Sequence, residues 1–293
     1  MARLFVSDVH LDAAAPQATD QFVDFLSAEA AAAEALYILG DLFEAWVGDD
    51  DEEPANERVC HALRTLTGRG VACFALHGNR DFLLGAGFSE RSGCRLLPDP
   101  VITQLDGERV LLTHGDALCT DDHAYQELRS IVRESSWQRR FLVLPRTTRE
   151  LLANEARAGS RRHTSRTVPD IMDVNPQAVV TAFRATGVRR MVHGHTHRPG
   201  VHQLEIDGAP AQRIVLGAWY EQGSYLRCEH GRYELRVLPR RGASAARARQ
   251  KRARPARGSS CRRASCARPA MPRGTGAQFC GGAAGAWPSS WAM

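Results

Sequence analysis

Residues 192–197 read VHGHTH, a run in which three histidines alternate with small residues. Because side chains alternate in direction along a strand, His193, His195 and His197 would point to the same side. Imidazole is the commonest metal ligand in proteins, since its neutral form offers a lone pair near neutral pH. The run therefore predicts metal ligands at the end of a strand, where the chain curls at Gly194.

Four other polar motifs each follow an apolar run with the length of a short strand. They are Asp8-x-His10, Gly40-Asp41, Gly78-Asn79-Arg80-Asp81 and His114-Gly115-Asp116. In an open α/β sheet, ligands bind where the strands finish at their carboxyl ends, so five such ends deliver their side chains to one crevice. The predicted ligands are two aspartates, one asparagine and four histidines: Asp8, His10, Asp41, Asn79, His114, His195 and His197.

This mixture of oxygen and imidazole donors favours Mn, Fe or Zn over a structural thiolate site. Seven ligands are too many for one tetrahedral ion, but they suit two ions that share a bridging carboxylate. The glycines let the backbone turn sharply and let a phosphate approach closely. Any one motif has an ordinary interpretation as a cap or a surface pair, whereas five at strand ends indicate a two-metal site.

The elements that must position these motifs alternate along the chain. Apolar runs at 3–7, 35–39, 71–76, 109–113 and 189–192 predict strands, and helical spacing covers 19–34, 55–68, 82–91 and 176–186, the last capped by Asn175. This alternation predicts βαβ units, an α/β fold and a largely parallel sheet. Three or four more strands fill 201–238, with Asp207-Gly208 as a hairpin turn between the first two.

Between about residues 121 and 168 the pattern is long, helical and without a strand. Residues 129–166 contain ten arginines and three glutamates around an apolar patch of Trp137 and residues 141–144. We expect a helical insertion, or lid, over a domain of residues 1–240. The alternative is an ordinary pair of solvated helices.

The charge of the chain is unevenly distributed. Residues 241–293 carry eleven basic and no acidic side chains, which leaves 27 basic and 33 acidic residues in the first 240. The folded part is therefore mildly acidic, and we expect no nucleic-acid binding by it. The Arg/Ala/Gly/Pro-rich tail cannot bury enough apolar surface to fold and is expected to be disordered. A basic tether and an unselected extension are both open interpretations of it.

The cysteines and the apolar runs indicate a cytoplasmic location. Five cysteines lie in the first 240 residues, an odd number without C-x-x-C spacing, which favours reduced thiols over a disulfide framework. The sequence has no apolar run long enough for a transmembrane helix and no signal-peptide pattern at its start.

The motif series resembles the calcineurin-like metallophosphoesterase superfamily. The longer strings YILGDLFEAWVGDD (37–50), HGNRDFLL (77–84), HGDALCTDD (114–122), IMDVNP (171–176), HGHTHRP (193–199) and VLGAW (215–219) resemble the UDP-2,3-diacylglucosamine pyrophosphohydrolase family of lipid A biosynthesis. The resemblance extends from residue 1 to about 240. It implies a sandwich of two mixed sheets flanked by helices, with the helical lid as an insertion.

The resemblance also implies a ligand assignment and a reaction. One Mn²⁺ would be held by Asp8, His10, Asp41 and His197, and a second by Asp41, Asn79, His114 and His195, so that Asp41 bridges. A metal-activated hydroxide would attack the α-phosphorus of the substrate, giving UMP and 2,3-diacylglucosamine 1-phosphate (lipid X). The implied catalytic residues are Asp41, Asn79, Arg80 and His114, and His193 is expected to be structural.

Arg80 stands where many members of the superfamily have a histidine that protonates the leaving group. A sugar phosphate leaves more readily than an alkoxide and needs charge stabilisation, which a permanently charged guanidinium supplies. The alternative is a surface arginine paired with Asp81.

The substrate contacts implied by the family are Asn79, Arg80, Asp122, Ser160, Thr164, Thr167 and His195. At Thr167 the family often has lysine; threonine cannot supply that charge, and Arg166 is the alternative. Arginines and apolar side chains in the lid fit a lipid diphosphate and predict peripheral attachment to the cytoplasmic face of the inner membrane.

Three other functions compete with this hypothesis. A different two-metal phosphoesterase, acting on cyclic nucleotides or nucleic acid, would favour histidine over Arg80. A metal-free binding scaffold would have lost several ligands, yet all seven are present. Nucleic-acid binding through the tail would depend on salt and disappear on truncation after Arg240.

Overall fold

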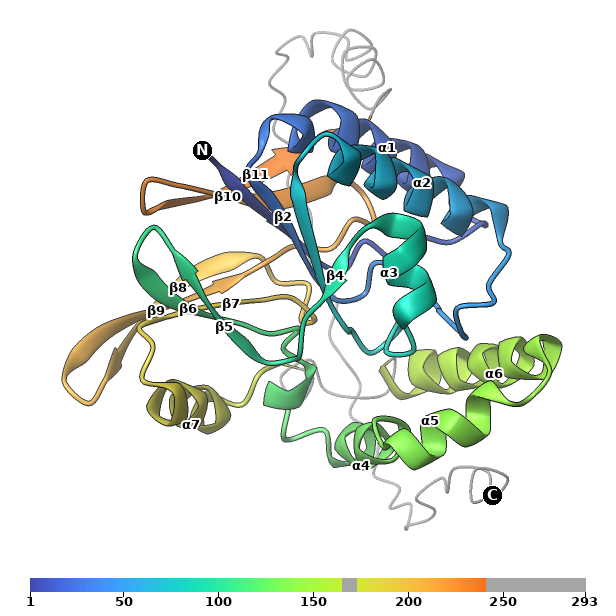
Figure 1. Ribbon diagram of the computed structural model, residues 1–293. Helices are drawn as coiled ribbons and strands as arrows, with labels where there is room; N and C mark the ends of the chain where they lie inside the picture. Colours follow the sequence, from blue (N-terminus) through green and yellow to red (C-terminus); the bar gives the residue numbers. More distant parts are fainter. Residues whose placement is uncertain (165–172, 241–293) are drawn as a thin grey trace, which may run out of the picture. The chain divides into compact units, whose positions relative to one another are not determined.

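Two mixed β-sheets pack face to face in the computed structural model, which describes residues 1–164 and 173–240, without the side chains at 161, 163 and 164 (Figure 1). The first sheet has the order β11-β10-β1-β2-β3-β4. Its strands are β1 (Arg3–Val6), β2 (Ala35–Leu39), β3 (Ala72–Leu76), β4 (Arg95–Leu96), β10 (Gly223–Glu229) and β11 (Arg232–Leu238). Strands β1 to β4 are parallel, and β10 and β11 are antiparallel.

The second sheet has the order β5-β6-β7-β9-β8. Its strands are β5 (Val101–Leu105), β6 (Glu108–Leu112), β7 (Arg190–His193), β8 (Gly200–Ile206) and β9 (Ala209–Val215). The three central strands are parallel, and both edge strands are antiparallel. The main core lies between the sheets, where Phe5 and Leu39 from the first meet Leu112 and Val192 from the second.

Helices cover the outer faces of both sheets. Helices α1 (Pro16–Ala28), α2 (Pro54–Gly68) and α3 (Ala86–Ser92) lie on the first sheet, and α7 (Pro176–Thr186) lies on the second (Figure 1). Phe183 of α7 is buried against Met191 and Leu111, which point away from the core between the sheets. Two short 3₁₀ helices, Ala30–Ala32 and Asp116–Leu118, complete the elements outside the insertion.

The predicted architecture of two mixed sheets flanked by helices is confirmed. So are the Asn175 cap, whose side chain accepts hydrogen bonds from the amides of Gln177 and Ala178, and the turn at Asp207-Gly208. The prediction of one largely parallel sheet is wrong, because the strands that carry the motifs are divided between two sheets.

Three local predictions also need correction. Strand β5 was not predicted, although Asp106-Gly107 has the same positive φ pair as Asp207-Gly208 and closes the β5–β6 hairpin. The helix expected at 82–91 begins at Ala86, because Leu84 donates back to the Asp81 carbonyl in a turn. The helix expected at 19–34 ends at Ala28, where a 3₁₀ turn takes over.

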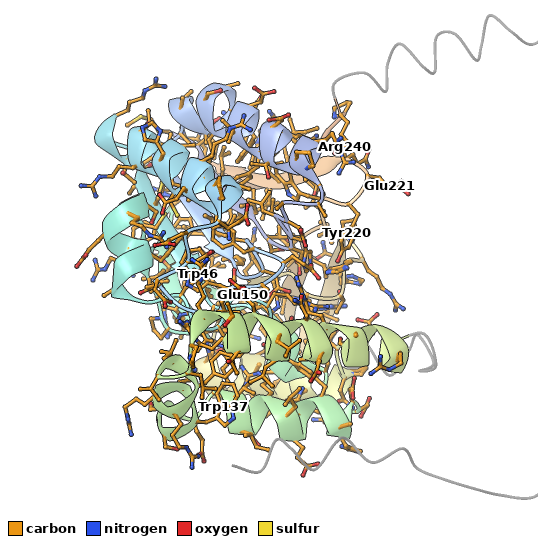
Figure 2. The ribbon with its side chains drawn as sticks, turned by 90° about the vertical axis from the view of Figure 1, so that its right-hand side faces the viewer. Trp46, Trp137, Glu150, Tyr220, Glu221 and Arg240 are labelled. Carbon is orange, nitrogen blue, oxygen red and sulfur yellow. The ribbon has the colours of Figure 1, made fainter. Side chains whose placement is uncertain are left out.

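The region expected to be a helical insertion forms α4 (His123–Val132), α5 (Ser135–Leu142) and α6 (Arg146–Thr164). Figure 2 shows Trp137 between α6 and the other helices of the insertion. Its ring stacks on Phe141 with centroids 4.9 Å apart and reaches Phe82 of the main domain at 6.2 Å. The apolar patch predicted from sequence therefore contributes an inner contact at Trp137 and Phe141.

Arg149 attaches α6 to the main domain. It is 2% exposed and donates to the carbonyl oxygen of Val47 and to the Asp50 carboxylate, while its Nε donates to Leu144 at 3.0 Å. None of the helices among the described residues is long and apolar enough to span a membrane.

We expect Arg149→Met to loosen α6 without unfolding the sheets. Hydrogen bonds to charged groups contribute about 1.5–3 kcal/mol each, so hydrogen exchange of the α6 amides should accelerate by roughly tenfold or more. Arg146→Met is the control, because Arg146 is partly exposed and pairs only with Glu52 and Glu150 among the described residues. Equal exchange in the two variants would show that Arg149 does not hold the helix.

Candidate active site

The loops that follow β1 and β2 run side by side and bring the first ligands together. The amide of Asp8 donates to the Gly40 carbonyl at 3.1 Å, and the amide of His10 donates to that of Asp41 at 3.0 Å. Leu11 and Phe43 then form a parallel bridge. This pairing extends the β1–β2 register past the ends of the strands and places Asp8, His10 and Asp41 at one point.

The backbone is left-handed at five of the seven predicted ligands. Positive φ angles occur at Asp8, His10, Asp41, His195 and His197, each between 53° and 68°. The other non-glycine residues with positive φ in the described ranges, Asp106, Asp207 and His230, lie in hairpin turns. A non-glycine residue in this region costs about 1 kcal/mol or more, so the surrounding contacts must hold it there.

Two glycines make room for the carboxylates. A Cβ atom at Gly78 would collide with the side chain and amide of Asp41. One at Gly194 would collide with Ser7 and with the carboxylate of Asp8. These positions therefore need glycine because backbone and carboxylate approach within contact distance.

One group of donor atoms consists of Asp8, His10 and His197. The Nε2 atoms of the two histidines are 3.3 Å apart, and Oδ1 of Asp8 lies 3.2 Å from Nε2 of His197 and 3.9 Å from that of His10. Asp8 and His10 are buried. Oδ1 of Asp8 is also buried and accepts no hydrogen bond from the residues described, which is the condition of a carboxylate that faces a cation site.

A second group forms around Asn79. Its Oδ1 lies 2.9 Å from Nε2 of His114 and 2.9 Å from Nδ1 of His195. Nδ1 of His114 donates to the Leu39 carbonyl at 2.9 Å, so the neutral imidazole carries its lone pair on Nε2.

Asp41 lies between the two groups. Its Oδ2 is 3.9 Å from Nε2 of His10 and 3.7 Å from Nε2 of His114. Its other oxygen accepts the amide of Arg80 at 2.7 Å. One carboxylate oxygen is thus available to both groups, and the structure brings all seven predicted ligands together.

The electrostatics of these side chains show that the buried carboxylates favour positive charge beside them. Burial raises the pKa of Asp41 to about 6. Burial lowers the pKa of His114, but the Asp41 and Asp8 carboxylates outweigh it and raise that pKa to about 9. Burial and the neighbouring His114 lower the pKa of His195 to about 3, so this imidazole is neutral. Oxygen and neutral nitrogen donors in this field fit divalent cations.

His193, the remaining histidine of VHGHTH, faces away from both groups. Its Nδ1 donates to the Gly194 carbonyl at 2.8 Å, and its Nε2 accepts from Arg213 at 3.0 Å. Burial and the Arg213 charge lower its pKa to about 4. Its hydrogen bond to Gly194 shapes the turn that carries His195.

Three carboxylates support the site although none of them was predicted as a site residue. Asp81 is fully buried and accepts from the amides of Asp41, Leu42 and Gly78 at 2.7–3.2 Å. Asp116 accepts from the Tyr125 hydroxyl at 2.6 Å and Nε of Arg129 at 2.8 Å, and Glu44 lies 2.9 Å from Nδ1 of His10. Asp81 and Asp116 are the last residues of the motifs that follow β3 and β6. A second polar residue after the ligand in each motif was therefore the sequence signal for them.

Arg80 lies at the edge of this cluster. Its Nη1 is 3.7 Å from Oε1 of Glu44, and its buried Nε has no partner within the described ranges. The Asp81 carboxylate is occupied by backbone amides, so the alternative of a surface Arg80–Asp81 pair is wrong.

The other predicted substrate residues lie on or near the insertion. Asp122 caps α4 by accepting the Tyr125 amide at 3.1 Å, and Tyr125 stacks beside His195 with centroids 5.9 Å apart. Ser160 is half-buried in α6, and Thr164 ends that helix. Thr167, its alternative Arg166 and the tail of residues 241–293 lie outside the described residues.

Known proteins resemble this chain over most of its length. A family model described as calcineurin-like phosphoesterase matches residues 1–199. A UDP-2,3-diacylglucosamine hydrolase from Enterobacter sp. (strain 638) is 48% identical over 239 residues, 82% of this chain and 100% of that protein. One of the same name from Stenotrophomonas maltophilia (strain R551-3) is 47% identical over 247 residues, with the same coverage. A solved archaeal phosphodiesterase aligns at 13% identity and a TM-score of 0.43, covering 81% of this chain and 100% of that one.

We expect Asp81→Asn to destabilise the loops that carry Asp41 and Asn79. An amide cannot accept all the backbone hydrogen bonds that the carboxylate accepts, and bonds to charged groups contribute about 1.5–3 kcal/mol each. The free energy of unfolding in urea with EDTA should fall by roughly 2–4 kcal/mol. Asp20→Asn, at an exposed pair with Arg58, is the control. Unfolding of Asp81→Asn at the wild-type urea concentration would contradict this role.

Proposed function

The chain belongs to the calcineurin-like phosphoesterase family, and we propose that it is a metal-dependent hydrolase of UDP-2,3-diacylglucosamine in lipid A biosynthesis. Water adds to the α-phosphorus, and the bond from that phosphorus to the bridging oxygen breaks. The products are UMP and 2,3-diacylglucosamine 1-phosphate. The identity with hydrolases of this name, which the chain matches over their whole length, supports the substrate.

The observation that carries the mechanism is the place of Asp41, whose Oδ2 lies within 4 Å of a histidine from each donor group. In the proposal, Asp8, His10, Asp41 and His197 would hold one Mn²⁺, and Asp41, Asn79, His114 and His195 would hold the other. Such a pair, when bound, supplies a hydroxide at neutral pH and stabilises charge on phosphoryl oxygens.

The protein's own residues prepare this site before substrate binds. Nδ1 of His114 donates a hydrogen bond to a backbone carbonyl, so the ring needs no reorientation for its Nε2 to bind a metal ion. Burial and the neighbouring His114 lower the pKa of His195 to about 3, so its imidazole is neutral and one ring nitrogen carries a lone pair. Fixed donors of this kind lower the barrier because they need not reorient as charge develops.

Arg80 is assigned to the leaving group. Its guanidinium is partly buried, with Nη1 3.7 Å from Oε1 of Glu44, whose other oxygen lies 2.9 Å from Nδ1 of His10. A sugar phosphate that departs gains a negative charge rather than a need for a proton, and an arginine meets that demand. This choice of side chain favours a diphosphate over an alkyl ester as substrate. Asp122, Ser160, Thr164 and Thr167, or Arg166 in its place, are proposed to contact the UDP-glucosamine part.

We expect Asp41→Ala to abolish turnover. The assay follows UMP release from UDP-2,3-diacylglucosamine with Mn²⁺, after EDTA, and after Mn²⁺ is restored. Loss of the shared ligand should reduce activity by about 100-fold or more, and Mn²⁺ should rescue only the EDTA-treated wild type. Asp20→Ala, on the exposed face of α1, should keep wild-type activity. Turnover that survives in Asp41→Ala would refute the two-metal mechanism.

The insertion also supports peripheral attachment to the cytoplasmic face of the inner membrane. Val143 is 82% exposed, Leu151 is 59% exposed and Leu142 is 41% exposed, and the exposed Arg139 and Arg140 precede Leu142 in α5. Apolar side chains next to arginines suit a surface of anionic lipid, where each basic residue contributes about 1 kcal/mol.

We expect Val143→Asp to weaken flotation of the protein with anionic phospholipid vesicles at low salt. Val237→Asp, which introduces the same charge at an exposed valine of β11, should float as the wild type does. Both variants are also tested in chains ended after Arg240, so that lipid binding by the basic tail is separated from binding by the insertion. Failure of the wild type to float, or equal flotation of both variants, would contradict attachment through the insertion.

A further inference from the structure

The carboxylate of Glu44 lies directly behind one predicted metal ligand. Its Oε2 is 2.9 Å from Nδ1 of His10, while Nε2 of His10 points to Asp8, Asp41 and His197. Because a carboxylate only accepts, Nδ1 carries the proton and Nε2 has the lone pair. The hydrogen bond therefore selects the tautomer of His10 that can bind a cation.

The backbone fixes Glu44 in this position. Its amide donates to the carbonyl oxygen of Leu11 at 2.9 Å, and the amide of Leu11 donates to that of Leu42 at 3.0 Å. Thus the segment after Asp41 runs beside the segment after Asp8. Glu44, three positions after Asp41, therefore reaches His10. The Glu44 side chain is 19% exposed, so its contact with His10 is shielded from solvent.

The support of His10 differs from that of the other histidines in the site. The distal nitrogen of His114 is bound to a neutral backbone carbonyl. Across residues 1–164 and 173–240, only His10 has a carboxylate at the nitrogen that faces away from the donor groups. A charged partner makes an imidazole a stronger donor than a neutral partner does.

The second oxygen of Glu44 connects this ligand to the leaving-group arginine. Oε1 lies 3.7 Å from Nη1 of Arg80. One side chain therefore touches a metal ligand with one oxygen and the guanidinium with the other. The face of the His10 ring has a separate support in Tyr220, which stacks on it with centroids 5.1 Å apart and lies beyond α6 in Figure 2.

We propose that Glu44 is a positioning residue that sets the tautomer and orientation of His10 and holds Arg80 beside the donor groups. The inference rests on the proposed two-metal function. According to this inference, the affinity of the cation site at Asp8, His10 and His197 depends on Glu44, which binds no cation itself. Carboxylates behind metal-bound histidines typically contribute about 10–100-fold in metal affinity.

The test is a calorimetric titration of the full chain with Mn²⁺, for wild type, Glu44→Ala, Glu44→Gln and Glu53→Gln. Glu44→Gln keeps an acceptor for Nδ1 but removes the charge that faces Arg80. Glu53→Gln makes the same change of charge at an exposed side chain that lines a surface cavity together with Glu44, and is the control. Thermal melts in EDTA check that each variant folds.

We expect wild type and Glu53→Gln to bind two ions alike. Glu44→Ala should weaken one ion by roughly 10–100-fold and change the other by less than about threefold, and Glu44→Gln should lie between Glu44→Ala and wild type. Two ions at wild-type affinity in Glu44→Ala would overturn the inference, since Tyr220 alone would then suffice to hold the ring. Equal weakening of both ions would also overturn it. If the wild type bound no Mn²⁺, the proposed function itself would fail.

Discussion

The structure depends on two carboxylates, Asp8 and Asp41, that are buried beside each other without a lysine or arginine ion pair among the described residues. Isolated buried charges are unfavourable by several kcal/mol unless a partner compensates them. Among the described residues, only imidazoles are positive partners of these carboxylates. Burial lowers the pKa of His114, but the carboxylates raise it to about 9. A pair of divalent cations would satisfy this demand without requiring His114 to be protonated. The ligands are therefore a charge cluster that the fold must hold together against its own repulsion.

The fold meets this demand through loops that continue the register of parallel strands. Strands β1, β2 and β3 of one sheet and β6 and β7 of the other end at the same edge of the core, and a residue of the site follows each of them by two or three positions. Left-handed backbone at five ligands turns their side chains inward, and Gly78 and Gly194 allow the chains to touch. Asp81 and Glu44 then restrain what the loops deliver, Asp81 by binding backbone amides and Glu44 by orienting His10. The insertion is attached beside the site through Asp116, which accepts hydrogen bonds from Tyr125 and Arg129 of α4.

Much of the fold and of the site could be predicted from sequence, for a physical reason. Each ligand follows an apolar run, so the alternation of apolar and polar residues alone assigns Asp8, Asp41, Asn79, His114 and His195 to strand ends. The division into two sheets was implied by the family resemblance alone. The apolar pattern could not predict it, because hydrogen-bond partners between strands depend on packing of side chains such as Leu112 and Val192 across the core. Asp81 and Glu44 could not be recognised as supporting residues either, since their roles arise from backbone amides and a histidine that only the folded loops bring near. For His193 the alternation pattern alone was misleading, because it groups this residue with the ligands. In the structure its Nε2 is bound by Arg213, twenty residues away in the sequence.

The central claim is that one carboxylate oxygen of Asp41 serves two cations. Anomalous diffraction at the manganese edge, from crystals of the full chain grown with Mn²⁺, tests it directly. We expect two anomalous peaks, one among Asp8, His10 and His197 and one among Asn79, His114 and His195, with Asp41 in contact with both. A single peak, or two peaks of which one has no contact with Asp41, would contradict it.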